Sequence, residues 1–297
     1  MVAFSPRHVY HFLLPPRLRG RLGLGLWLSH QLQREQHQLV SSLLCHSPFS
    51  AGDIKQRATL TLAAAGCCYS TLLQFLKAEN PSFFQDRRQK LERNDSDREQ
   101  QLKQLLDGQG SDKASKHRYH QLYARALADP SSVGQMLEIG IGTNNTDVVS
   151  NMGEEGMPGA SLRAWHAFLP QAWIHGADID RDILFDDNRI RCHWVDQLSI
   201  TSLHQLAADI ESPLDLIIDD GLHSVQANLQ TLQMAIGCIR HQGWIFIEDI
   251  YEPQADFFLA LSWILHQQGI ASRLYEFSTP GMVFAVSPGR PLQAFPQ

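Results

Sequence analysis

The sequence has few cysteines, little excess charge and no cysteine spacing typical of a metal site. The 297 residues contain five cysteines, an odd number scattered along the chain: Cys45, Cys67, Cys68, Cys192 and Cys238. Such usage indicates reduced thiols rather than a disulfide framework, so we expect a cytoplasmic protein. The net charge is −6, which provides no broad basic surface for nucleic acid or anionic lipid. We therefore expect no nucleic-acid partner.

Long apolar runs are also missing from the sequence. The apolar segment 22–28 is short, contains Gly23 and Gly25, and is not followed by a small-residue cleavage site. A membrane span needs about 20 consecutive apolar residues, and the sequence contains no such run. We expect neither secretion nor insertion into a membrane.

The first 109 residues carry helical patterns and lack strand signals. Apolar spacing predicts helices over 31–44 and 53–77, and a polar helix over 83–106. Gly108 and Gly110 end the last of these. We expect residues 1–109 to form a helical N-terminal region that contacts substrate or a second copy of the chain, which makes a homo-oligomer possible.

From residue 110 onward, short apolar segments alternate with helical segments. This alternation predicts an α/β domain over 110–297, with a doubly wound, mostly parallel, Rossmann-like sheet. The last two strands flank Thr279-Pro280-Gly281 and predict a hairpin, which would place one antiparallel strand at the edge. The sheet is expected to have seven strands, at 135–139, 173–177, 191–195, 214–218, 243–247, 271–277 and 282–286.

Acidic side chains follow five of these strands at the point where each one ends. In an open parallel sheet, ligands bind beyond the carboxyl ends of the strands, so these side chains are expected to gather at one edge. Carboxylates that crowd together repel one another and need a cation or protons to be tolerated. The pattern therefore indicates a metal-assisted reaction centre at the group Asp219, Asp220 and His223 and the pair Glu248 and Asp249, beside a cofactor site at Glu138, Asp178 and Asp196.

The first strand runs into a glycine turn at Gly140 and Gly142, typical of a nucleotide-type cofactor site. The third glycine of the dinucleotide fingerprint is missing, and Glu138 would repel a phosphate. S-adenosylmethionine suits this turn because it is cationic and has no phosphate. We expect Asp178 to bind its ribose hydroxyls and Asp196 to accept a hydrogen bond from its adenine amino group.

Several motifs together resemble class I S-adenosylmethionine-dependent methyltransferases, in particular the metal-dependent sugar O-methyltransferases of macrolide biosynthesis and related glycan-modifying enzymes. The resemblance covers about residues 110–287. A segment at 110–113, followed by His117, Tyr119 and Tyr123, is similar to the Gly-Thr-Asp-Lys segment of that branch. The other matching motifs are Leu137 to Gly142, Gly159 to Arg163, Gly176 to Asp180, Asp219 to His223, and Ile247 to Asp249.

The resemblance implies a methyl transfer from S-adenosylmethionine to a hydroxyl of a sugar or glycosylated natural product. It implies Mg²⁺ (or Mn²⁺) held by Asp220, Glu248 and Asp249, with His223 as the general base. An imidazole, with an ordinary pKa of about 6.5, suits removal of a hydroxyl proton near neutral pH. The expected catalytic residues are thus His223 and Asp220, and the expected cofactor-binding residues are Glu138, Gly140, Gly142, Ser161, Asp178, Asp196 and Asp219.

The residues leave alternatives open. Asp219 is also suited to cap the helix that follows it, and Lys113 to neutralise the acidic cluster, to bind substrate or to lie on the surface. An NAD(P)-dependent oxidoreductase on a Rossmann sheet is a rival activity, which the missing third glycine disfavours. A non-catalytic scaffold with a methyltransferase fold is another, which the mutually repelling carboxylates disfavour.

Overall fold

The computed structural model describes residue 68 and residues 70–297. The chain divides into two compact units, residues 1–76 and 77–297. The predicted helix over 31–44 and most of that over 53–77 lie outside the described residues, and residues 70–79 are helical. No described helix is both long and apolar enough to cross a membrane. Residues 77–109 belong to the unit that contains the sheet, while the division by role at residue 109 stays a prediction.

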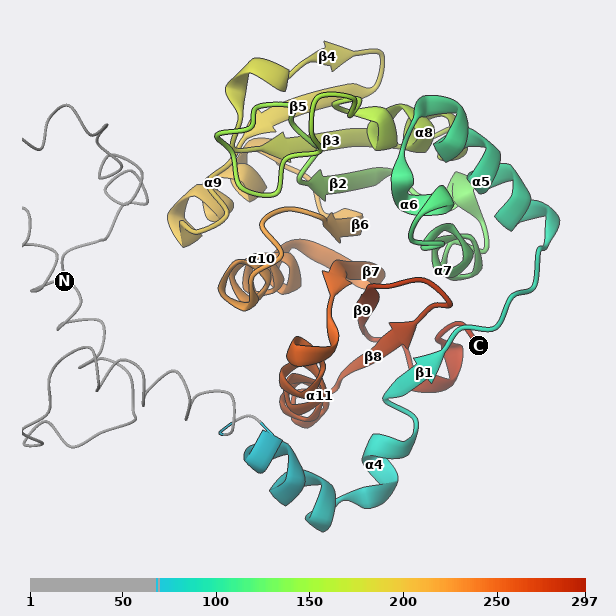
Figure 1. Cartoon of the computed structure of the whole chain (residues 1–297), viewed down its shortest axis with the longest axis vertical. Helices are drawn as coiled ribbons and strands as arrows, with labels where there is room; N and C mark the ends of the chain where they lie inside the picture. The colour runs from blue at the N-terminus through green and yellow to red at the C-terminus, as the bar shows by residue number, and fades with distance from the viewer. Residues whose placement is uncertain (1–67, 69) are drawn as a thin grey trace, which may run out of the picture. The chain divides into compact units, whose positions relative to one another are not determined.

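A single mixed sheet forms the centre of the unit 77–297 (Figure 1). Five of its eight strand pairings are parallel and three are antiparallel. The predicted fold class, α/β with a mostly parallel sheet, is confirmed. In spatial order the strands are β1 (Arg88–Lys90), β8 (Ile270–Glu276), β9 (Met282–Pro288), β7 (Ile239–Ile250), β6 (Leu214–Asp219), β2 (Gln135–Ile139), β3 (Trp173–Asp178), β5 (Ile190–Trp194) and β4 (Asp186–Asp187).

Two details of the predicted sheet were wrong. The described sheet has nine strands rather than seven, because β1 and β4 were missed. These two strands are three and two residues long and consist of polar residues, so they carry no apolar alternation. The antiparallel hairpin strand β9 is not at the edge but lies between β7 and β8, antiparallel to both. Strand order is a matter of tertiary pairing, which the hairpin signal does not specify.

Helices cover both faces of the sheet, with α9, α10 and α11 along one face and α5 to α8 along the other (Figure 1). The helix predicted over 83–106 is confirmed over 97–106, but its continuity was wrong, because residues 86–96 are not helical. The chain forms α4, then β1, then α5, whose start is capped by Ser96 accepting from the Glu99 amide. The helices are α4 (Pro81–Gln85), α5 (Asp97–Gln109), α6 (Asp112–Ser115), α7 (His120–Ala126), α8 (Ala160–Phe168), α9 (Ile200–Ile210), α10 (Val225–Cys238) and α11 (Glu252–Gln267).

The apolar core joins α5, α7 and α8 to the sheet. Leu102 and Leu106 of α5, the sparse apolar side of an otherwise polar helix, are fully buried in the same cluster as Trp165 of α8. Burying a leucine side chain contributes about 2 kcal/mol. This packing fixes the residues that follow α5, including Lys113 in α6, against the carboxyl ends of the strands.

The direction in which the chain fills the sheet reverses between β2 and β6. From β2 the chain proceeds outward to β3 and β5, and it then crosses back to form β6 and β7 on the other side of β2. Such a reversal leaves a crevice at the carboxyl ends of the two adjacent strands, where ligands bind in open α/β sheets. Glu138 and Asp219 lie at these ends, where Glu138 pairs with Ile218 and Ile139 pairs with Asp219.

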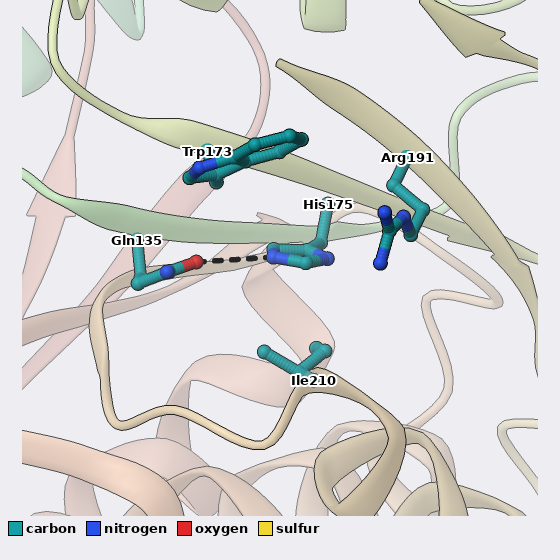
Figure 2. Close-up of a pocket in the computed structure, with 5 residues that line it drawn as sticks. All are labelled: Gln135, Trp173, His175, Arg191 and Ile210. Atoms are coloured by element: carbon teal, nitrogen blue, oxygen red, sulfur yellow. Dashed lines mark hydrogen bonds between the residues drawn. The ribbon is translucent and has the colours of Figure 1, made fainter.

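The amino ends of the strands carry a separate small hollow, lined by Gln135, Trp173, His175, Arg191 and Ile210 (Figure 2). The His175 ring bonds to Gln135 Oε1 through Nε2, at 3.0 Å, and to His193 Nε2 through Nδ1, also at 3.0 Å. Burial, with a smaller contribution from the charges of His193 and Arg191, lowers the pKa of His175 to about 4.

The buried His175 makes the fold sensitive to acid. An unfolded histidine has a pKa of about 6.5, so between this value and about 4 the unfolded state binds more protons. Stability is therefore lost as the pH falls through this range, by about 1–3 kcal/mol for this residue. We expect the free energy of unfolding to fall less for His175→Gln than for the wild type as the pH is lowered from about 7 to about 4. Urea titrations at each pH measure this difference.

A matched control is His204→Gln, which changes an exposed imidazole on α9. It should leave the pH dependence of stability unchanged. Equal slopes for His175→Gln and the wild type would contradict a contribution from His175.

Candidate functional site

Three acidic side chains from three strands meet one buried lysine. Glu138 comes from β2, Asp220 follows β6 and Glu248 belongs to β7. Lys113 Nζ, from α6, lies 2.5 Å from Asp220 Oδ2, 2.6 Å from Glu248 Oε2 and 3.2 Å from Glu138 Oε1. The side chain of Lys113 is only 3% exposed. The alternative of a surface lysine is excluded, and Lys113 neutralises the acidic cluster.

Electrostatics in this cluster depend on burial and on mutual charge. Burial alone disfavours the ammonium form of Lys113, but the charges of Asp220, Glu248 and Glu138 raise its pKa well above the usual value. Burial raises the pKa of Glu138 and of Glu248, and the charge of Lys113 opposes both shifts. Lys113 is therefore a permanent internal cation among partly compensated carboxylates.

Next to this lysine, Asp220, His223 and Asp249 converge on a common point. One ligand atom from each lies within 4.8 Å of the others. His223 Nε2 is 3.9 Å from Asp220 Oδ1 and 3.7 Å from Asp249 Oδ2. His223 and Asp249 both have positive φ, 53° and 54°, a conformation that non-glycine residues rarely adopt and that concentrates at functional sites.

Two tyrosines in the segment after Lys113 donate hydrogen bonds to acidic residues of this site. Tyr119 donates a hydrogen bond to Asp249 Oδ1 at 2.6 Å, and Tyr123 donates one to Glu248 Oε1. The buried phenols have raised pKa values, chiefly because of burial and then because of these carboxylates. No role was predicted for Tyr119 or Tyr123; their signal in the sequence is their place in the segment after Lys113.

The glycine turn after β2 lies directly against this cluster. Gly140 has φ +85°, and a Cβ atom there would lie 2.1 Å from the backbone oxygen of Asp220. Gly142 has φ +80°, and a Cβ atom there would meet the Met152 side chain. Only glycine lets the turn approach the Asp220 loop this closely.

The other predicted cofactor residues lie around the turn, each with protein partners. Asp178 accepts from the amides of Ile141 and Asp180 at 2.9 and 3.0 Å, and burial raises its pKa. Ser161 is buried at the start of α8 beside Glu138; burial raises the pKa of Glu138, and the Ser161 hydroxyl opposes part of that rise. Asp196 accepts from the Leu198 amide at 3.0 Å.

Asp219 points into the protein. It is fully buried and accepts hydrogen bonds from Gln197 Nε2 at 2.6 Å and Asn228 Nδ2 at 3.0 Å. Gln197 Oε1 in turn accepts from the Leu222 amide at 2.8 Å. Asp219 and Gln197 thus fix the loop that presents Asp220 and His223. The sequence analysis missed Gln197, because nothing in its neighbourhood marks it.

The donor set fits a small divalent cation. Asp220 Oδ1 and Asp249 Oδ2 are hard oxygen donors of the kind that such ions prefer, and both lie within 4 Å of the His223 imidazole. Glu248 differs from Asp220 and Asp249, because both of its carboxylate oxygens already accept hydrogen bonds, one from Lys113 and one from Tyr123. The predicted ligand set of Asp220, Glu248 and Asp249 stays a prediction.

The chain is similar to sugar O-methyltransferases of antibiotic pathways, although no protein-family model matches it. It is 30% identical over 133 residues to 8-demethyl-8-(2-methoxy-alpha-L-rhamnosyl)-tetracenomycin-C 3'-O-methyltransferase of Streptomyces olivaceus, covering 45% of this chain and 31% of the relative. It is 29% identical over 138 residues to L-olivosyl-oleandolide 3-O-methyltransferase of Streptomyces antibioticus, covering 45% and 32%.

Among solved structures, the chain resembles the MycE methyltransferase of mycinamycin biosynthesis in complex with Mg and SAH. The TM-score is 0.53 and the identity 28%, covering 64% of this chain and 55% of MycE. The chain thus spans about a third of the length of the curated relatives and about half of MycE. The expected resemblance to metal-dependent sugar O-methyltransferases is confirmed.

The tight approach of the glycine turn predicts a strong effect of a single methyl group. We expect Gly140→Ala to lower the free energy of unfolding by about 2 kcal/mol or more, because the positive φ and the backbone clash add. Urea denaturation measures this change. Gly108→Ala is the matched control, because a Cβ atom at this helical position meets nothing within 4 Å, and it should be neutral or stabilising. A stability loss no larger for Gly140→Ala than for Gly108→Ala would contradict the tight approach.

Proposed function

We propose that this protein is a divalent-metal-dependent O-methyltransferase, which transfers a methyl group from S-adenosylmethionine to a hydroxyl of a sugar or glycosylated natural product. The observation that carries the proposal is the convergence of Asp220, His223 and Asp249 at the switch point of the sheet, beside the Gly140 turn. The bound Mg and SAH of the similar MycE structure support the same assignment.

Each acidic residue has a role in this proposal. Asp220 and Asp249, together with Glu248, would hold Mg²⁺ or Mn²⁺. A bound divalent ion favours the alkoxide form of an acceptor hydroxyl. Glu248 would reach the ion only by exchanging a bond to Lys113 or Tyr123. Tyr119 keeps Asp249 Oδ1 occupied, which leaves Oδ2 toward His223.

His223 is the proposed base. Its Nε2 atom faces the two carboxylates, while its buried Nδ1 has no hydrogen-bond partner. Nε2 is therefore the atom that would take the acceptor's hydroxyl proton. The backbone carbonyl of His223 accepts from Gln254 Nε2 at 3.2 Å, which helps to fix this loop.

The methyl donor is proposed to lie against the turn at Gly140 and Gly142. Glu138 and Ser161 would line it, and the negative charge of this wall suits a sulfonium cofactor rather than a pyrophosphate. Asp178 and Asp196 are proposed to contact its ribose and adenine. The homo-oligomer, the lack of a nucleic-acid partner and the cytoplasmic location stay predictions.

Binding of the cofactor can be tested without the acceptor. Isothermal titration calorimetry should show binding of S-adenosylhomocysteine and none of NAD, because the turn lacks a phosphate cradle. Binding of NAD alone would favour the oxidoreductase, and binding of neither would favour a scaffold.

The metal and the base are tested by methyl transfer to a panel of rhamnosylated and deoxysugar-bearing polyketides. Protein stripped with EDTA should lose activity and regain it with Mg²⁺ or Mn²⁺. His223→Ala should lower the rate by about 100-fold or more at neutral pH. His204→Ala, at an exposed position, is the control and should retain the wild-type rate. Full activity in EDTA would remove the metal role, and full activity in His223→Ala would remove the base.

A further inference from the structure

We propose that Lys113 is a built-in cation that fills one of two neighbouring cation positions in the acidic cluster, and that it limits the site to a single divalent ion. This inference rests on the proposed metal site but concerns Lys113, to which the ligand set assigns no role. The surroundings of the Lys113 ammonium group resemble those of a metal ion held by several carboxylates more than those of a lysine in an ordinary ion pair.

The first argument is the arrangement around the ammonium group. Oxygens from three separate carboxylates, on Glu138, Asp220 and Glu248, lie 2.5–3.2 Å from Lys113 Nζ. A surface lysine pairs with one carboxylate and keeps its water. Here the lysine side chain is 3% exposed, and those of Glu138 and Glu248 are 0% and 1% exposed. Three carboxylates around one buried cation are the surroundings that a hard metal ion has in proteins.

The second argument is that Asp220 belongs to both positions. Its Oδ2 atom bonds to Lys113, while its Oδ1 atom faces His223 Nε2 at 3.9 Å, in the group that also contains Asp249. A carboxylate shared in this way is the bridge of a two-cation site, with one cation on each oxygen. In this chain one of the two cations is covalently part of the protein.

The third argument is the state of Glu138. Neither of its oxygens accepts a hydrogen bond of good geometry, although the side chain is fully buried. Within the described part of the chain, the cation that lies next to it is Lys113, at 3.2 Å from Oε1. Without Lys113, the cluster would hold Glu138, Asp220 and Glu248 with no positive charge between them. Such a cluster recruits a cation or protons.

The inference predicts that loss of Lys113 opens a second metal position. We expect Lys113→Ala to bind one divalent ion more than the wild type. The measurement is equilibrium dialysis of the full-length proteins, freed of metal with EDTA, against MnCl₂, followed by elemental analysis of the bound Mn²⁺. Lys113→Gln provides a second variant that keeps more of the side-chain volume. Lys116→Gln is the matched control, because Lys116 lies three residues further along and its side chain is 72% exposed.

A spectroscopic readout separates this role from a merely structural one. Two Mn²⁺ ions bridged by one carboxylate are magnetically coupled, so the electron paramagnetic resonance spectrum of Lys113→Ala should differ from that of an isolated ion. The Lys116→Gln spectrum should match the wild type. A general loss of structure at the site would lower the ion count rather than raise it.

Every outcome of the count decides the inference. One additional ion in the Lys113 variants, relative to the wild type, supports the inference. If the wild type itself binds no ion, the proposed metal role of Asp220 and Asp249 fails, but the additional ion in the variants still supports the role of Lys113. An equal or smaller number of ions than in the wild type overturns it. Should both variants be unfolded without metal, their thermal unfolding midpoints in MnCl₂ replace the count. A larger rise with MnCl₂ than in the wild type then supports the inference, and an equal or smaller rise overturns it.

Discussion

The contact on which the site depends is that between the Lys113 ammonium and carboxylates from three strands. Without a positive charge at this place, the buried Glu138 and Glu248 and the partly exposed Asp220 would lie together and would repel one another. A fully buried ion pair is rarely a net source of stability, because both partners lose their hydration. Its value here is positional, since it holds three carboxyl groups in place at the carboxyl edge of the sheet.

The short segment from Lys113 to Tyr123 fixes the positions of the acidic side chains through several of its residues. Lys113 holds Asp220 and Glu248, Tyr119 holds one oxygen of Asp249, and Tyr123 holds the other oxygen of Glu248. The segment is itself fastened by packing of α5 and α7 into the core and by the contact of the Tyr123 ring with Trp165 and Phe246. The apolar core thus sets the positions of the polar groups, since a side chain locked by packing presents its oxygen in one orientation.

Two levels of organisation can be distinguished around the crevice. Asp219, Gln197 and Asn228 form a buried set of hydrogen bonds that shapes the loop after β6. Asp220, His223 and Asp249 lie beyond it with atoms free to bind a ligand. Adjacent residues of one motif therefore have opposite tasks, and Asp219 takes the structural one because its side chain points back among the helices.

Much of this could be read from the sequence, for identifiable reasons. The alternation of apolar strands and helices predicted the α/β sheet. The acids at the strand ends predicted that Asp220, His223, Glu248 and Asp249 would meet, and three of them, Asp220, His223 and Asp249, form the possible metal-binding group. This follows because parallel strands bring their carboxyl ends to one edge. Strands β1 and β4 escaped because two or three polar residues leave no periodic signal.

Only the tertiary structure decided which acids form the possible metal-binding group and which are occupied by protein groups. The sequence placed Asp219 among the cofactor-binding residues and grouped Glu248 with Asp220 and Asp249, because a carboxylate carries no local sign of its partner. Lys113 is 107 residues from Asp220 and 135 from Glu248, and Gln197 is 22 from Asp219. Hydrogen bonds over such separations depend on how helices pack on the sheet, and no short-range pattern records that packing.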